Sequence, residues 1–112
     1  MPVVWSLRGG SSFIRVRESG QSGRAPHVTL KVLRMGDGQP VRLGMAVSRQ
    51  VGNAVHRNLL RRRLRMIISE VAEHLLGMAV TIRLLTGAAS APFAVLRHSV
   101  RSALRQARVQ LI

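Results

Sequence analysis

The sequence predicts one α+β domain, a two-layer sandwich with helices packed on a small β-sheet. Residues 27–33 and 41–47 alternate large apolar side chains with polar or small ones, as strands with one buried face do. Between residues 60 and 75 the apolar positions follow helical spacing instead. The predicted order along residues 1–112 is helix, strand, strand, long helix, strand and helix, and this length suits a single core.

The chain opens with residues 1–10, which are expected to form an irregular N-terminal arm. One of the two serines that follow caps a short helix, and Gly20 ends it. Gly, Ser and Pro over residues 20–26 predict a loop. The strand over residues 27–33 then buries one face, which carries Val28, Leu30 and Val32.

Residues 35–40 give the clearest turn signal, because Asp37 followed by Gly38 favours the positive φ of tight hairpins. The sequence therefore predicts that residues 41–47 return antiparallel to the first strand. One face of this second strand carries its large apolar residues. The other face carries small and basic residues, and it leaves room for a backbone to lie against the sheet: Arg42, Gly44, Ala46 and Ser48.

The last third of the chain predicts a strand and a helix. Gly77 ends the long helix, and residues 79–85 predict a buried strand. A final helix opens at Ser90 or Ala91, with Pro92 in its first turn. Its apolar stripe consists of Phe93, Leu96, Val100, Ala103, Leu104 and Ala107. Its exposed side carries Arg97, Arg101, Arg105 and Arg108.

Charge is the strongest signal in the composition. Eighteen Lys and Arg residues against four Asp and Glu residues leave a net charge of +14, and Lys31 is the one lysine. Arginine suits forked contact with phosphate, and so large a charge repels itself unless a polyanion offsets it. The sequence therefore favours nucleic acid as the partner. An anionic membrane is less favoured, because the apolar stripes are needed for the core.

Other classes are excluded by what the composition lacks. The chain contains no cysteine, which excludes a disulfide framework and a thiolate metal site. The N-terminal residues lack the charged and apolar regions of a signal peptide, and no apolar run reaches the length of a membrane span. We expect a cytoplasmic protein without membrane association and without an obligate protein partner.

Residues 47–70 organise the rest of the chain. They run from the end of a strand, through a turn at Gly52 and Asn53, into a helix crowded with arginine. Its apolar positions fall within about 100° of arc: Leu60, Leu64, Ile67, Ile68, Val71 and Leu75. An adjoining arc of about 140° carries Arg57, Asn58, Arg61, Arg62 and Arg65. Such an edge suits a polyanion.

Residues 47–65 follow the pattern Val-Ser-Arg-Gln-Val-Gly-Asn-Ala-Val-His-Arg-Asn-x-x-x-Arg-x-x-Arg. This pattern resembles the signature of the bacterial ribonuclease P protein subunit. The resemblance implies a fold similar to a domain of a small-subunit ribosomal protein, with two parallel strands joined by a left-handed crossover through the basic helix. Physical rules alone favour a right-handed crossover.

The resemblance also implies a function. The family's protein subunit binds the catalytic ribonuclease P RNA and the 5′ leader of precursor tRNA. The holoenzyme, an endoribonuclease, removes that leader and so produces the mature tRNA 5′ end. The RNA subunit is the catalyst, and Mg²⁺ is held mainly by that RNA.

The family's RNA-contacting residues map onto the basic helix and the turn before it: Arg49, Asn53, Arg57, Asn58, Arg61, Arg62 and Arg65. Asn53 also suits the helix N-cap, and both roles are compatible. The second arginine of the family's core triplet is replaced by Leu59, and Arg61 to Arg63 bring charge from the next turn. Arg63 itself points away from both arcs and is expected to be solvated.

The resemblance implies a second site, a groove for the leader. In the family it is a cleft between the sheet and the basic helix, bordered by the first helix and lined with aromatic residues. The corresponding residues here are Phe13, Val16, Arg17, Thr29, Lys31 and Ala46. Two aromatic positions have become Arg17 and Lys31, and aromatic residues make up only 3% of the chain. We therefore expect leader binding that is more electrostatic and less base-selective than is usual in the family.

The sequence predicts no catalytic residues of its own. Its acids are Glu18, Asp37, Glu70 and Glu73, and its four histidines are scattered without the spacing of metal ligands. No metal is expected to be bound by the protein alone, and the groups that could contribute ligands are Asn58 and backbone oxygens. Two alternatives remain: a structural RNA-binding protein of a ribosome or of another ribonucleoprotein, and, more remotely, a nucleoid-type DNA binder.

Overall fold

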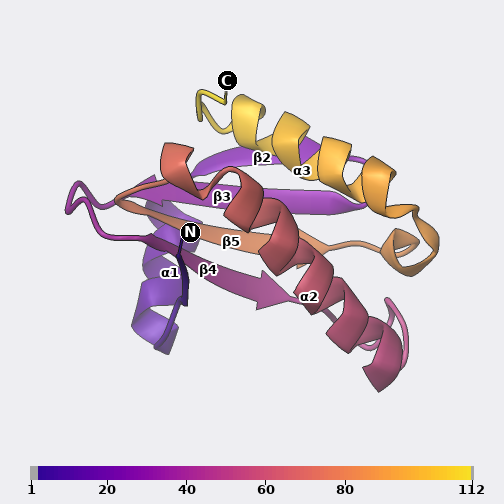
Figure 1. Cartoon of the computed structure of the whole chain (residues 1–112). Coiled ribbons are helices and arrows are strands. Elements are labelled where there is room, and N and C mark those ends of the chain that lie inside the picture. The colour runs from indigo at the N-terminus through magenta and orange to yellow at the C-terminus, as the bar shows by residue number, and fades with distance from the viewer. Residues whose placement is uncertain (1–2, 112) are drawn as a thin grey trace.

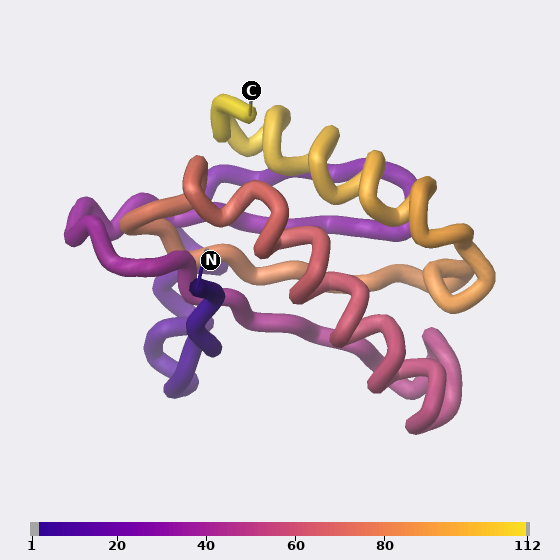
Figure 2. Tube along the Cα trace, in the orientation of Figure 1, coloured from indigo at the N-terminus to yellow at the C-terminus, as the bar shows by residue number. Residues whose placement is uncertain are grey.

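The structure, a computed structural model, describes residues 3–111. Figures 1 and 2 show a five-stranded sheet with α2 and α3 on one face and α1 against the other. The elements in chain order are β1 (Val4–Ser6), α1 (Gly10–Ser19), β2 (Gln21–Ala25), β3 (Val28–Arg34), β4 (Val41–Ala46), α2 (Ala54–Glu70), the 3₁₀ turn η1 (Ala72–His74), β5 (Met78–Leu84), the 3₁₀ turn η2 (Ala88–Ser90) and α3 (Phe93–Gln106). The α+β fold class is confirmed.

The strand order is β1-β4-β5-β3-β2. β5 pairs antiparallel with β3 and parallel with β4, so it lies between the two strands that were expected to form a hairpin. That prediction is wrong, although β4 does run opposite to β3. The backbone of Gly77, just before β5, lies between the two ends of the 35–40 loop. Its carbonyl accepts from Met35 N at 2.6 Å, and its N–H donates to the carbonyl of Gln39 at 2.7 Å.

Asp37 helps to hold the same loop closed. Its carboxylate accepts hydrogen bonds from Arg42 Nη2 at 2.6 Å and from the backbone N–H of Gln39 at 3.1 Å. These two bonds, the first above all, lower the pKa of Asp37. The positive φ angles of the loop belong to Gly36 and Gly38. The chain therefore does turn at residues 35–40, as predicted. The turn is wider than a tight hairpin, because β5 lies between the two strands that it connects.

Because β4 and β5 are parallel neighbours, the chain must cross one face of the sheet between them, and α2 makes this crossover. In Figure 1, α2 passes in front of the sheet from the end of β4 back to the start of β5, which lies above β4. This crossover is left-handed, as the family resemblance implied.

The core lies between the sheet and the pair α2 and α3. The predicted stripe of the long helix is buried from Leu60 to Leu75, and the predicted inward face of β3 is buried opposite it. Asn53 is the N-cap of α2, because its side-chain oxygen accepts from His56 N at 3.0 Å. The stripe on α3 is buried as well, except for Phe93, which is partly buried. The predicted buried stripes and the Asn53 cap are confirmed, but α2 ends at Glu70 rather than running to Gly77, and η1 follows it.

Two segments without predicted structure are strands. Residues 4–6 of the expected irregular arm form β1, which pairs parallel with β4 at one edge of the sheet. Residues 1 and 2 of that arm lie outside the described residues. The expected loop over residues 20–26 contains β2, which pairs antiparallel with β3 at the other edge. β1 is too short to show a pattern, and the small residues of β2 hid its strand character.

Gly23 shows why β2 contains small residues. A Cβ atom on Gly23 would lie 1.8 Å from the carbonyl oxygen of Ala103 in α3. The missing side chain therefore lets α3 rest directly on the edge strand. Arg24 N, next along β2, donates to Gln106 Oε1 at 3.0 Å and ties the strand to the end of the helix.

Gly23→Ala is expected to destabilise the protein by about 3 kcal/mol, because the methyl group meets backbone that cannot move without shifting α3. Gly10→Ala is the matched control, since a Cβ there meets nothing within 4 Å. Urea unfolding of the two variants measures the difference. A Gly23→Ala variant as stable as the control would show that α3 does not rest on β2 as described.

Candidate nucleic-acid interface

The first surface is the α2 edge, which consists of Arg57, Asn58, Arg61 and Arg65. These residues lie on the arc beside the buried stripe of α2. Asn58 is exposed, and the three arginines are half-buried. Arg65 Nη2 donates to Ser6 Oγ of β1 at 2.6 Å, so the α2 edge faces the β1 side of the sheet. Arg61 Nη1 donates to Asn58 Oδ1 at 3.1 Å. These two bonds fix guanidinium groups in a row.

Arg57 begins this row. Its Nε is buried and has no hydrogen-bond partner among the described residues. Arg62 of α2 and Arg49 of the loop between β4 and α2 are exposed. The predicted RNA-binding residues therefore lie on α2 and in the loop that leads into it. Arg63 lies off this row and is half-buried rather than fully solvated.

Asn58 is the one side chain that was expected to offer a metal ligand. Its side-chain oxygen already accepts from the Arg61 guanidinium, a fixed cation where a metal ion would have to bind. Among residues 3–111 no three His, Cys, Asp or Glu side chains come together in a way that would hold a metal. The donor set around Asn58 therefore does not fit a Mg²⁺ site on this chain alone.

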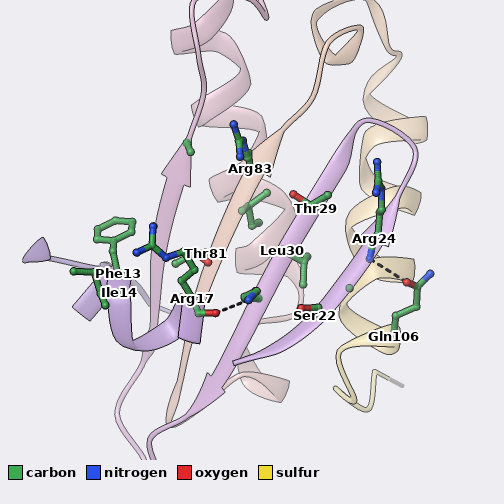
Figure 3. Close-up of a pocket in the computed structure, with 15 residues that line it drawn as sticks. Phe13, Ile14, Arg17, Ser22, Arg24, Thr29, Leu30, Thr81, Arg83 and Gln106 are labelled. Carbon is green, nitrogen blue, oxygen red and sulfur yellow. Dashed lines mark hydrogen bonds between the residues drawn. The ribbon is translucent and has the colours of Figure 1, made fainter. Parts of the chain in front are cut away.

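The second surface is the sheet groove, a hollow of about 580 Å³ between α1 and the sheet face opposite α2. Figure 3 shows Phe13, Ile14 and Arg17 of α1 along one side, with side chains of the strands across the floor. No residue of α2 lines it. The expected cleft between the sheet and the basic helix is therefore corrected: α1 forms the wall, because α2 packs on the other face of the sheet.

Gly44 allows the Phe13 ring to lie on the floor of the groove. A Cβ atom on Gly44 would lie 2.5 Å from Phe13 Cε1, so the ring occupies the space that a side chain would take. The small residues of β4 were expected to leave room for a backbone against the sheet, but at Gly44 the ring of Phe13 fills that space. Phe13 remains 38% exposed and borders the groove.

The other predicted groove residues divide into two groups. Arg17, Thr29, Lys31 and Ala46 line the groove. Val16 does not: it is buried beneath α1, because its side chain supplies the apolar contact that seats the helix. The ammonium of Lys31 donates to the carbonyl of Arg17 near the end of α1. Lys31 therefore also caps a helix terminus, where a cation is favourable.

Arg24 and Arg83 line the groove, although the sequence did not predict them as groove residues. Arg83 of β5 is paired in register with Ala46 of β4 and with Thr29 of β3, and Thr29 is paired with Arg24 of β2. These four residues form one row across the sheet, and Figure 3 shows the three labelled members of the row on the same face. Arg83 is the one charged residue in the mostly apolar β5. Its charge was the sequence feature that could have indicated an exposed position on that strand.

Acidic residues lie away from the groove. Among residues 3–111 the ion pairs join Asp37 to Arg42, Glu70 to Arg97 at 3.0 Å, and Glu73 to His74. Glu18, next to Arg17 in sequence, does not line the groove. Arg17, Arg24 and Arg83 therefore present their charge without an acidic partner in the lining. No helix within residues 3–111 is long and apolar enough to cross a membrane.

Comparison with known proteins places this arrangement in a family. A family model described as Ribonuclease P matches residues 1–108. A ribonuclease P protein component from Kocuria rhizophila is 39% identical over 108 residues, which cover 96% of this chain and 95% of the relative. One from Gluconacetobacter diazotrophicus is 35% identical over 106 residues, which cover 93% of this chain and 91% of the relative.

Solved structures share the fold. The RNase P protein from Staphylococcus aureus superposes with a TM-score of 0.83 at 23% identity, covering 94% of this chain and 96% of that one. The RNase P protein from Thermotoga maritima gives a TM-score of 0.77 at 21% identity, covering 95% and 98%. The chain therefore belongs to the ribonuclease P protein family and is the accessory protein subunit of the RNA-containing holoenzyme that matures tRNA 5′ ends.

Proposed function

We propose that the α2 edge binds the catalytic ribonuclease P RNA and that the sheet groove binds the 5′ leader of precursor tRNA. The observation that carries this division is that the two basic surfaces lie on different faces of the sheet, with α2 on one and the groove on the other. Each surface then takes a different RNA segment, and the protein holds the leader while it is anchored to the catalyst.

The α2 edge suits a folded RNA. The guanidinium groups of Arg61 and Arg65 are held in place by Asn58 and by Ser6 before any ligand arrives. Pre-positioned arginines lose less side-chain freedom on contact with phosphate, and their forked donors match phosphate geometry.

The sheet groove suits a single strand. Its floor includes Thr29, Ala46 and Thr81, which are small enough to let an unpaired backbone approach the sheet. Arg17, Arg24 and Arg83 supply cations for the phosphates along the groove, whereas Phe13 is the one aromatic residue in its lining. Leader affinity should therefore depend mainly on the phosphate backbone, with little base selectivity.

The chemistry of cleavage is assigned to the RNA subunit. Mg²⁺ in the holoenzyme would be held by RNA phosphates, since the donor set around Asn58 does not fit a metal. The protein contributes by positioning: binding at two sites brings the leader to the catalyst and raises its effective concentration there. We further propose that the protein works in the cytoplasm, where precursor tRNA is made in a bacterium.

Cleavage in a reconstituted system tests the proposed function. Purified protein is added to a bacterial ribonuclease P RNA at low millimolar Mg²⁺, and cleavage of precursor tRNA is timed. The protein should accelerate cleavage more for a leader of several nucleotides than for a leader of one. Arg57→Ala combined with Arg61→Ala should weaken binding to the catalytic RNA and lower the slope of log affinity against log salt by roughly one to two.

The control for this double variant is Arg15→Ala combined with Arg63→Ala, which removes the same charge outside both surfaces. Equal losses in the two double variants would mean that net charge alone matters and would contradict a specific α2 edge. Tight binding of both RNAs without any acceleration would instead indicate a structural RNA-binding protein.

A variant of the sheet groove tests whether this surface binds the 5′ leader. Arg24→Ala combined with Arg83→Ala should remove most of the advantage of a long leader while leaving cleavage of a one-nucleotide leader nearly unchanged. All-purine and all-pyrimidine leaders should bind the wild-type protein with similar affinity, because phosphates dominate the contact. A length advantage that survives the double variant, or a strong preference for one leader sequence, would contradict a phosphate-binding groove.

A further inference from the structure

A third group of cations lies outside both surfaces described above. The α3 row consists of Arg101, Arg105 and Arg108 on the last two turns of α3 and the residue after its C-cap. Arg105 and Arg108 are exposed, and Arg101 is half-buried. None of the three lines the sheet groove or belongs to the α2 edge. Neither of the two contacts proposed above involves them.

Two contacts fix which way the α3 row points. Arg97, one turn before the row, pairs with Glu70 at the end of α2, so its side of α3 faces α2. Gln106 accepts from Arg24 N of β2, so the opposite side of α3 faces the edge strand. By helical spacing, Arg101 and Arg105 lie about 40° and 80° around the helix from Arg97, on the way to the side of Gln106. Arg108 follows the C-cap, just beyond the regular helix.

The charges in the α3 row repel one another. Arg97, Arg101 and Arg105 are spaced four residues apart, so consecutive side chains are neighbours on the helix surface. Like charges at this spacing destabilise a helix. α3 contains no acidic residue, and the pairing of Glu70 with Arg97 leaves the three members of the row without an acidic partner among the described ion pairs. The Nε of Arg101 is buried and unpartnered within residues 3–111.

Arg108 adds backbone strain to this repulsion. It adopts a φ of 69° directly after the C-cap Ala107, in the left-handed conformation that glycine occupies most readily. The helix end is otherwise regular: Val109 N donates to the carbonyl of Leu104 at 3.0 Å, and Arg34 Nη2 donates to the carbonyl of Arg108 at 2.6 Å. Both bonds involve backbone atoms that a glycine would keep. The arginine side chain is therefore not required by the fold.

We propose that the α3 row binds the backbone phosphates of a double-helical RNA segment, as a contact separate from the α2 edge and the sheet groove. This inference rests on the proposed function for one premise, which is that the protein assembles with a folded RNA. A phosphate backbone explains both unfavourable features, because it would offset the repulsion and give the Arg108 side chain a ligand.

A duplex fits the α3 row better than a single strand does. The row occupies the last two turns of a rigid helix and the residue after its C-cap, and it lies outside the sheet groove. Single strands are usually bound by aromatic stacking platforms, and the nearest aromatic residue on α3, Phe93, is partly buried at the opposite end. The contact would read the shape and charge of the duplex rather than its sequence.

The test uses substitutions that should stabilise the fold. Arg105→Ala removes a like-charge neighbour, and Arg108→Gly removes the strained side chain, so the double variant should have a higher Tm than the wild type. Its affinity for a blunt RNA duplex of mixed sequence should nevertheless fall. Because two phosphate contacts are lost, the ratio of wild-type to variant duplex affinity should be roughly tenfold larger at 50 mM than at 200 mM salt. A loss of affinity in a more stable protein cannot be attributed to unfolding.

Two controls separate charge from backbone strain. Arg108→Lys keeps the charge in the same backbone conformation and should retain most of the duplex affinity. His27→Gly relieves another residue with a φ of 69° without changing a fixed charge, and should leave duplex affinity unchanged. A double variant with wild-type affinity and wild-type salt slope would overturn the proposal and show that the α3 row is simply solvated.

The source of the duplex is identified by repeating the measurement with ribonuclease P RNA alone and with precursor tRNA alone. A deficit with either RNA supports the α3 row and names its partner, whereas a deficit with neither overturns it. Failure of the proposed function is distinguished by the cleavage assay. If the wild-type protein accelerates cleavage and the α3 double variant binds both RNAs normally, only the α3 contact is wrong.

Discussion

The position of β5 between β3 and β4 is the constraint on which the rest of the structure depends. A strand that is parallel to β4 and adjacent to it requires a crossover, and the crossover places α2 over one face of the sheet. α3 then packs beside α2 on that face, and together the two helices bury the apolar side of every central strand. Within residues 3–111, α1 is the helix on the opposite face, so the row from Ala46 to Arg24 remains open as the floor of a groove.

The same arrangement distributes the charge. With a net charge of +14, arginines gathered in one place would strongly destabilise the folded state. The fold instead separates them onto the α2 edge, the sheet groove and the α3 row, while the acids Asp37 and Glu70 are paired with Arg42 and Arg97 outside these surfaces. Each surface therefore keeps its full positive charge. A ribonucleoprotein supplies the polyanion that such a protein needs.

Local patterns predicted the elements but not their neighbours. The alternation around Leu30 and the helical spacing from Leu60 identified the buried faces, because those signals depend only on the period of a strand or helix. Strand order depends on contacts between distant residues, such as Gly77 with Gln39, so the hairpin signal at Asp37 led to the wrong pairing. In the site, the basic helix was visible in sequence, whereas Arg83 was not, since one arginine in an apolar strand reveals its face only when its cross-strand partners are known.

The central claim is that the two faces of this domain hold different RNAs, and the absence of cysteine from the chain allows a direct test. Arg83→Cys and Arg61→Cys each introduce a single thiol, one in the sheet groove and one on the α2 edge, to which a photo-crosslinker is attached. In the assembled holoenzyme with precursor tRNA, the account predicts that position 83 crosslinks to the 5′ leader and position 61 to the catalytic RNA. Crosslinks from both positions to the same RNA segment would contradict it.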